Sequence, residues 1–93
     1  MMKNKAYSNG QKTFEQVGEE LTYFFKNGKI KAEGISINGI MEGEWKFYRE
    51  TGQLWQVGNF KEGQKHGFWI RYDKIGKLEY QKTFANGNSI KSK

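Results

Sequence analysis

Apolar and turn-forming residues recur along this chain with a step of 24 residues. Trp45 and Trp69 stand 24 residues apart. Four further sets keep the same step: Phe24, Tyr48 and Tyr72; Gly28, Gly52 and Gly76; Ile30, Leu54 and Leu78; and Gly39, Gly63 and Gly87. A fixed spacing of roughly 20–50 residues is the signature of stacked supersecondary units. The pattern therefore predicts a repeat protein in which one small unit is used about three times.

Glycines mark two turns in each predicted unit. The first turn falls at Asn27-Gly28, Thr51-Gly52 and Ile75-Gly76, and the second at Asn38-Gly39, Glu62-Gly63 and Asn86-Gly87. Asn-Gly favours a tight hairpin turn because both residues tolerate positive φ. The intervals between turns leave room for strands of about 5–7 residues. We therefore predict one β-hairpin per unit and an all-β fold in which successive hairpins form an antiparallel meander.

The predicted repeat domain spans residues 13–90, with units at about 24–47, 48–71 and 72–90 and basic tails at 1–12 and 91–93. Segment 13–23 fits the period poorly. We favour a strand there, in a shortened hairpin that uses Asn9-Gly10 as a turn. The alternative is a short amphipathic helix, because the apolar residues Phe14, Val17, Leu21 and Phe24 have helical spacing. Gly18 weakens the helix interpretation.

Strand alternation in the second unit predicts two unlike faces. If its turn spans Lys61 to His66, Phe60 lies opposite Gly67. One face then carries the repeating residues Leu54, Gly58, Phe60, Trp69 and Arg71, with Gly58 as a bare position over which a ring could lie. The other face carries Trp55, Val57, Phe68 and Ile70, where the first unit has Lys31, Glu33, Glu44 and Lys46. Since the repeat tolerates charge there, something specific is expected to cover or bind this patch.

Two explanations of the patch remain open. Residues 13–25 could fold back over it and close a small core, since most large apolar side chains are buried. Alternatively, the patch binds a protein partner or a second copy of the chain, because contiguous exposed apolar patches mark interaction sites. In the second case Trp55, Val57, Phe68 and Ile70 are the binding residues, with Tyr48 and Tyr72 at the edge of the patch.

The distribution of charge and of apolar residues argues against nucleic acid or a membrane as the main partner. The net charge is +6, but residues 13–81 hold ten basic and ten acidic residues, so the excess lies at the two ends. Basic ends attract polyanions weakly and in a salt-dependent way. No apolar run reaches the roughly 18 residues of a membrane span, and residues 1–10 lack the apolar core of a secretory signal. We therefore expect a cytoplasmic protein and rank nucleic acid or an anionic membrane below a protein partner.

Catalytic chemistry has few residues available. The chain has no cysteine, and its one histidine, His66, lies in a predicted turn where the first unit has Glu42. This substitution indicates a solvated polar group and not a catalytic base. The sequence contains no cluster of His, Cys or carboxylate residues that could bind a metal ion. The prediction is a protein that is not an enzyme, with no cofactor and no metal site.

The chain contains the motif Tyr48-x-x-x-Gly52-x-Leu54, continued by Phe60-x-x-Gly63-x-Lys65-His66-Gly67-x-Trp69-x-x-Tyr72-x-x-x-Gly76-x-Leu78. This motif resembles the variant form of the MORN repeat. The name stands for membrane occupation and recognition nexus. The resemblance covers about residues 24–90 and is greatest to short bacterial proteins described as antitoxin components of toxin–antitoxin pairs. It implies β-hairpins in an open, twisted single-layer sheet, with a scaffolding or protein-binding role. Lipid binding, claimed for some classical members, transfers poorly, because Gly43-Glu44-Trp45 and Gly67-Phe68-Trp69 replace their Gly-x-Gly pair.

The sequence thus predicts a non-enzymatic protein-interaction module, specifically an antitoxin-like inhibitor that binds and blocks a partner such as a cognate toxin or enzyme. A homodimer through the same patch is the other protein partner considered. A β-sheet scaffold that binds nucleic acid or anionic lipid is the alternative function.

Overall fold

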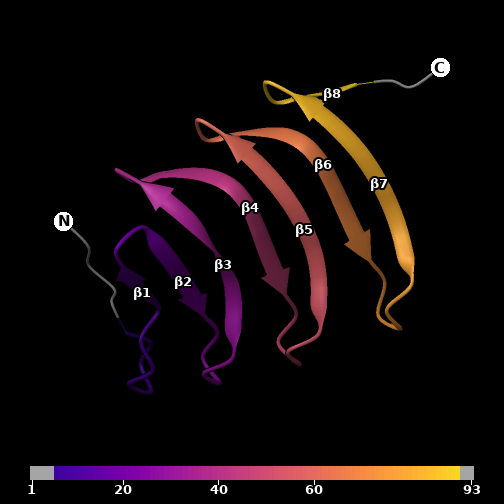
Figure 1. Ribbon diagram of the computed structural model, residues 1–93. Helices are drawn as coiled ribbons and strands as arrows, with labels where there is room; N and C mark the ends of the chain where they lie inside the picture. The colour runs from indigo at the N-terminus through magenta and orange to yellow at the C-terminus, as the bar shows by residue number, and fades with distance from the viewer. Residues whose placement is uncertain (1–5, 91–93) are drawn as a thin grey trace.

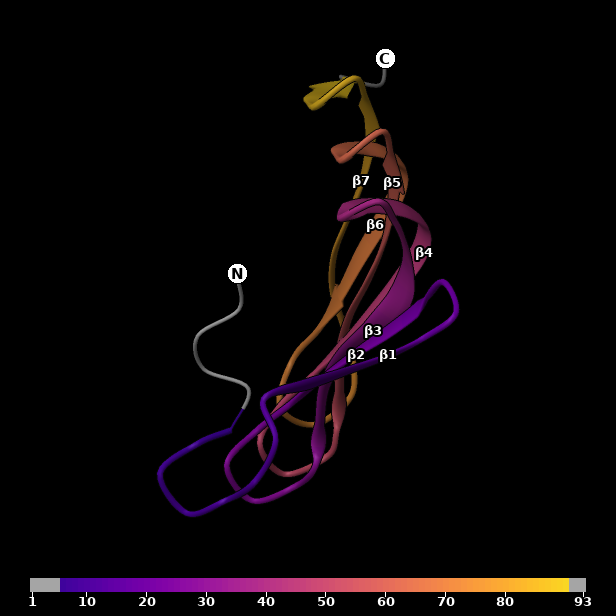
Figure 2. The ribbon, with the colours of Figure 1, turned by 90° about the vertical axis from the view of Figure 1, so that its left-hand side faces the viewer.

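The computed structural model describes residues 6–90, which form eight strands in one sheet. The strands are β1 (Phe14–Val17), β2 (Glu20–Phe24), β3 (Ile30–Ile37), β4 (Ile40–Tyr48), β5 (Leu54–Lys61), β6 (Gln64–Tyr72), β7 (Leu78–Ala85) and β8 (Asn88–Ile90). Each strand pairs antiparallel with its neighbours in the sequence. Figure 1 shows the strands side by side in chain order, and Figure 2 shows that they make one curved, twisted layer. The predicted all-β meander in an open single-layer sheet is confirmed.

Two-residue turns close the hairpins of the three full units. Pairing continues up to Ile37↔Ile40, Lys61↔Gln64 and Ala85↔Asn88. The turn residues have φ of 52° and 80° at Asn38-Gly39, 53° and 83° at Glu62-Gly63, and 51° and 88° at Asn86-Gly87. Positive φ at both positions defines the type I′ turn that suits the twist of paired strands. The longer turn predicted from Lys61 to His66 is therefore wrong, and Phe60 lies opposite Lys65 instead of Gly67 in its hairpin.

The turns at the other end of the sheet are also copies of one another. The first residue of each donates its N–H to the carbonyl four positions on, in Phe25–Lys29, Arg49–Gln53 and Asp73–Lys77. The same bond, 2.6 Å long, joins Tyr7 to Gln11. The N-terminal segment is therefore a fourth, shortened copy, and it uses the predicted Asn9-Gly10 turn. The strand prediction for segment 13–23 is confirmed as β1 and β2, joined at Gly18 with φ of 61°, and the helix alternative is wrong.

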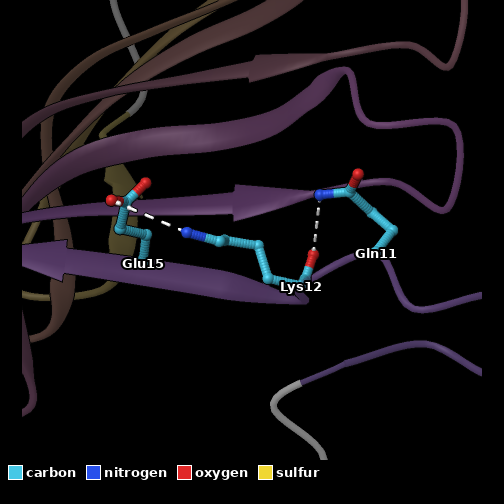
Figure 3. A network of polar contacts seen from close by, with 3 residues as sticks. All are labelled: Gln11, Lys12 and Glu15. Carbon is cyan, nitrogen blue, oxygen red and sulfur yellow. Dashed lines mark hydrogen bonds and ion pairs between the residues drawn. The ribbon is translucent and has the colours of Figure 1, made fainter.

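Residues 6–12, assigned from the sequence to a basic tail, pack against the start of the sheet. The Tyr7 hydroxyl donates a 2.7 Å hydrogen bond to the carbonyl of Phe24. Figure 3 shows how Lys12 leads into β1: its Nζ lies 3.8 Å from Glu15, and its carbonyl accepts a 3.2 Å bond from the Gln11 side chain. Residues 1–5 and 91–93 of the two predicted tails lie outside the described residues.

Side chains link successive turns into a ladder along the sheet. The Asn9 amide donates to the carbonyl of Lys26 at 3.0 Å, and the Asn27 amide donates to that of Glu50 at 3.0 Å. The Arg49 guanidinium donates to the carbonyl of Tyr72 at 3.1 Å. Each unit is therefore fastened to the next one through a loop as well as through strand pairing.

The core lies on one side of the sheet, which we call the aromatic face because it bears Trp45 and Trp69. These indoles are 0% and 2% exposed. Their N–H groups donate 2.9 Å bonds to the carbonyls of Ile35 and Asn59, respectively, so the one polar atom of each ring is satisfied. Phe60 packs edge-on against both rings, with centroids 6.4 and 5.2 Å away. One aromatic layer therefore crosses several strands without a second sheet above it.

Candidate functional site

A β-bulge places Trp55 on the aromatic face. Phe47 pairs with Gln56 and Tyr48 pairs with Leu54, which leaves Trp55 as the extra residue. A bulge redirects the side chain that it inserts and interrupts strict alternation. The Trp55 ring lies 5.2 Å from the guanidinium carbon of Arg71, and Arg71 pairs with Gln56 across β5 and β6. The prediction that Trp55 shares a face with Val57, Phe68 and Ile70 is wrong.

The same bulge moves Leu54 to the opposite side, which we call the reverse face because it bears Val57, Phe68 and Ile70. Leu54 pairs with Tyr48, whose hydroxyl reaches Glu33 on that side. The predicted grouping of Leu54 with Gly58 and Trp69 is therefore also wrong. The bulge recurs at Lys31 and Glu79, so it belongs to the repeat and not to the second unit alone.

An open apolar hollow lies beside Trp55 on the aromatic face. Its volume is about 430 Å³, and strands β2 to β5 supply most of its lining. The lining residues are Tyr23, Phe25, Lys31, Ala32, Met41, Trp45, Phe47, Tyr48 and Trp55. None of these residues carries a carboxylate, and Lys31 is the one charged residue among them. The hollow can therefore receive an apolar side chain from outside.

Five basic side chains lie over rings of this region. Lys65 lies 4.7 Å from the Trp69 ring, and Arg71 lies 4.6 Å from the Tyr80 ring. The other three are Lys82 over Tyr80 at 5.6 Å, Arg49 over Trp55 at 5.8 Å and Lys31 over Phe25 at 5.9 Å. Within residues 6–90, the one ion pair shorter than 4.0 Å joins Lys12 to Glu15, so these cations have no such carboxylate partner. The face is therefore aromatic and positively charged.

Arg49 differs from the other four cations in having a buried nitrogen without a hydrogen-bond partner. One terminal nitrogen donates to the carbonyl of Tyr72, but its Nε is buried without a hydrogen-bond partner. Arg71 differs, because its Nε and one terminal nitrogen both donate to the side-chain oxygen of Gln56, at 3.1 and 3.0 Å. Two guanidiniums thus flank one indole, and Arg49 retains unused donor capacity.

The reverse face brings together the other predicted binding residues. Val57 lies directly opposite Ile70, and Phe68 is 57% exposed on the same strand as Ile70. Segment 13–25 does not cover them, because β1 and β2 continue the sheet beside β3 (Figure 2). The patch on this face is therefore Val57, Phe68 and Ile70 without Trp55.

Acidic residues gather on the reverse face beside that patch. Glu20, Glu33 and Glu44 line a polar hollow of about 320 Å³ together with Lys46. The Tyr48 hydroxyl donates a 2.6 Å bond to Glu33. Burial, this hydrogen bond and the charge of Glu33 raise the pKa of Tyr48 to about 12. Tyr48 is therefore bound within the sheet, while Tyr72 pairs with Leu78 at the equivalent position of the next unit.

The structure places the histidine and carboxylate side chains that the sequence considered for catalysis or metal binding. Within residues 6–90, no group of three or more His, Asp or Glu side chains is placed to hold a metal ion. His66 is half-buried, with Nδ1 enclosed and without a hydrogen-bond partner, so it is less solvated than the sequence predicts. Gly67, with φ of 77°, lies next to it at the register shift between β5 and β6.

No helix among the described residues is long and apolar enough to cross a membrane.

Sequence reasoning missed most of the residues that form the aromatic face. Tyr23, Met41 and Phe47 line the hollow, and Arg49 and Lys65 supply charge at the rings. Phe47 could have been found, because it lies two residues after Trp45 on one strand and must share its face. Arg49 gives no such signal, since it lies in a loop whose position depends on the bulge.

Comparison with known proteins bears on part of the chain. Residues 41–62, which run from β4 through the turn into β5, match the MORN repeat variant family. This repeat is generally a non-catalytic module for interaction with proteins or membranes. No curated protein and no solved structure matches the chain. The match identifies one repeat, and the structure shows the same hairpin on both sides of it.

Proposed function

We propose that this protein is a non-enzymatic interaction module that binds a partner protein through its aromatic face and blocks it. The observation that carries the proposal is the open apolar hollow beside Trp55. Trp residues dominate the energetics of protein interfaces when they border such pockets. The general role of the repeat matched at residues 41–62 supports a binding function.

The faces of the sheet suit a partner better than its edges do. The two edge strands are short, with four residues in β1 and three in β8. Short edge strands offer few free backbone groups to an added strand. A stable complex needs about 800 Å² on each partner. A layer with extents of 49 × 34 × 18 Å offers such an area on its broad sides.

In its specific form, the proposal is an antitoxin-like inhibitor that acts in the cytoplasm on a toxin or an enzyme. The resemblance of the repeated turn, tryptophan and tyrosine positions to short bacterial antitoxin components supports this form. Inhibition would follow from occupation of the partner's surface and would need no chemistry on this chain. The product encoded beside this chain's gene is the first partner to test.

The test measures binding of that purified product to the full chain and to two single variants. Trp55→Ala should weaken binding by more than about 1 kcal/mol, because it removes a wall of the hollow. Phe68→Ala is the matched control, since it truncates an exposed aromatic side chain on the reverse face. A complex that tolerates Trp55→Ala would contradict the proposed use of the aromatic face.

The reverse face supplies a second candidate surface. Phe68 is 57% exposed and lies beside the Val57–Ile70 pair, so the patch could bind a protein or a second copy of the chain, with Tyr48 and Tyr72 near its edge. If this surface is used, Phe68→Ala should weaken the complex and Trp55→Ala should not. A concentration-dependent elution volume that Phe68→Ala abolishes would assign the patch to a homodimer.

A further inference from the structure

We propose that the aromatic face recognises an acidic segment of the partner protein, with a carboxylate held by Arg49 and Arg71 and a neighbouring large apolar side chain seated in the hollow. This inference rests on the proposed function and specifies the chemistry of the partner. Its basis is the juxtaposition of two guanidiniums, one indole and one apolar hollow, all of which meet at Trp55.

The charge of the face requires a negative partner. The cations Lys31, Arg49, Lys65, Arg71 and Lys82 lie over aromatic rings, and within the described residues none has a carboxylate oxygen within 4.0 Å. Rings hold these side chains in place, so less conformational entropy is lost when they bind an anion. The acids Glu20, Glu33 and Glu44 lie on the reverse face, whereas Glu79 occupies the bulge position equivalent to Trp55, so the five cations outnumber that acid on the aromatic face.

The arginine pair favours a carboxylate at a defined point. Guanidiniums bind carboxylates through paired N–H donors, and the Tyr72 carbonyl takes only one terminal nitrogen of Arg49, which leaves the other terminal nitrogen without a protein acceptor among the described residues. Both guanidinium carbons lie within contact range of the same ring, at 5.8 and 5.2 Å from the Trp55 ring. A carboxylate placed there would neutralise two like charges.

The hollow favours a partner segment with an apolar side chain next to its carboxylate. Trp55 borders both features, so the two binding groups of the partner must be neighbours. A volume of about 430 Å³ accommodates a large side chain such as Leu, Phe or Trp, and the lining offers few polar groups. The expected segment therefore carries Asp or Glu close to one large apolar residue.

The positive charge of the aromatic face argues against binding of the chain's own ends or of a second copy of the chain there. Both ends of the chain are basic, since residues 1–5 contain Lys3 and Lys5 and residues 91–93 contain Lys91 and Lys93. The cations on the aromatic face would repel those ends. Two aromatic faces would repel each other in the same way. An acidic partner avoids both conflicts.

A peptide fits the face better than a nucleic acid does. Bases bind non-specifically by stacking on exposed aromatic rings. Here Trp45 and Trp69 are 0% and 2% exposed, and guanidiniums already lie against Trp55. The hollow also lacks the polar groups that would bind the edge of a base. Tyr23, at 39% exposure, is the most exposed ring of the hollow, so the apolar lining and not base stacking distinguishes this face, which favours a peptide that carries a carboxylate.

The test selects binders for the immobilised full chain from a random library of displayed 12-residue peptides. Enriched peptides should combine Asp or Glu with a large apolar residue nearby. One enriched peptide is then synthesised, and its affinity is measured by fluorescence anisotropy in about 0.15 M salt. Arg49→Gln and Arg71→Gln should each weaken its binding about tenfold. Lys74→Gln makes the same charge change in the exposed Asp73–Lys77 turn and should change affinity less than about twofold.

Several results would overturn the acidic assignment. These are enriched peptides without acids, a library that yields no binder, equal losses from Lys74→Gln and Arg49→Gln, or tighter binding of a 20-nucleotide oligothymidine or of anionic vesicles than of the selected peptide. Arg71 also bonds to Gln56, so a thermal melt must show that Arg71→Gln is folded; if it is not, Arg49→Gln decides. Neutral peptides that still require Trp55 would overturn this inference and leave the proposed function intact. A cognate partner insensitive to Trp55→Ala would instead contradict the proposed function.

Discussion

The indole of Trp69 lies against Gly58 on the neighbouring strand, so close that a Cβ at residue 58 would stand 2.4 Å from the ring. The previous unit repeats this relationship at Trp45 and Gly34, where the distance would be 2.3 Å. A fully enclosed indole in a one-layer sheet needs a neighbour without a side chain. The Trp–Gly pair is therefore the unit from which this core is built.

Gly58→Ala should destabilise the protein by about 1–3 kcal/mol, because the added methyl group must displace a buried ring. The free energy of unfolding in urea measures this cost. The Trp69→Leu background is the control, since a smaller side chain leaves room for the methyl group. An equal cost of Gly58→Ala in both backgrounds would show that the ring contact is not its cause.

The three tryptophans should contribute unequally to stability. Trp45→Ala and Trp69→Ala should each cost about 3–5 kcal/mol, because they remove buried indoles and the cavities cannot refill. Trp55→Ala should cost less, since that ring borders an open hollow. Thermal unfolding of the three variants gives the comparison. Equal losses would place Trp55 in the core and weaken its assignment to binding.

Glu62→Asn should stabilise the protein by about 1 kcal/mol. Glu62 has φ of 53°, and the equivalent turn positions hold Asn38 and Asn86, which tolerate the left-handed region better. The backbone N–H of Glu62, which bonds to Glu42 at 2.9 Å, is retained in the variant. Glu50→Asn is the matched control, because Glu50 has no positive φ. No gain in urea stability at residue 62 would contradict the strain argument.

Tyr48 should ionise about two pH units above an ordinary tyrosine. Burial, the hydrogen bond to Glu33 and the charge of Glu33 raise its pKa from 10.0 to about 12. The folded state therefore holds this proton more tightly than the unfolded state does, and the contribution to stability falls as the pH rises from 10 to 12. Ultraviolet difference spectra of the chain and of Tyr48→Phe isolate the titration. A tyrosinate signal near pH 10 that Tyr48→Phe removes would contradict it.

The sequence predicts the fold well because its turns are chemically explicit. Asn38-Gly39 and Asn86-Gly87 require positive φ, and their spacing sets strand length and number. Pairing at Trp55 could not be predicted in the same way. The bulge position holds Lys31, Trp55 and Glu79 in successive units, so no residue type marks it. One extra residue shifts the side-chain alternation for every residue before it in the strand. The bulge therefore exchanges the predicted faces of Trp55 and Leu54.

The candidate site was predictable only in part for the same reason. The sequence singles out Trp55 as unusual, but the residues around it depend on the bulge and on the loop that carries Arg49. Formal charge also misleads here, because residues 13–81 balance overall while the two faces do not. The sequence already predicts Arg71 on the face opposite Glu33 and Glu44, but the rings over which Arg71 and Lys65 lie become visible only after the register is known.

The ladder of loops from Asn9 to Lys26, from Asn27 to Glu50 and from Arg49 to Tyr72 fastens each unit to its immediate successor alone. These contacts between neighbouring units do not depend on the total number of repeat units. Gene duplication can therefore lengthen or shorten the protein by whole hairpins while the remaining ones keep their shape. The length of the sheet can therefore evolve to match the size of the surface that it binds.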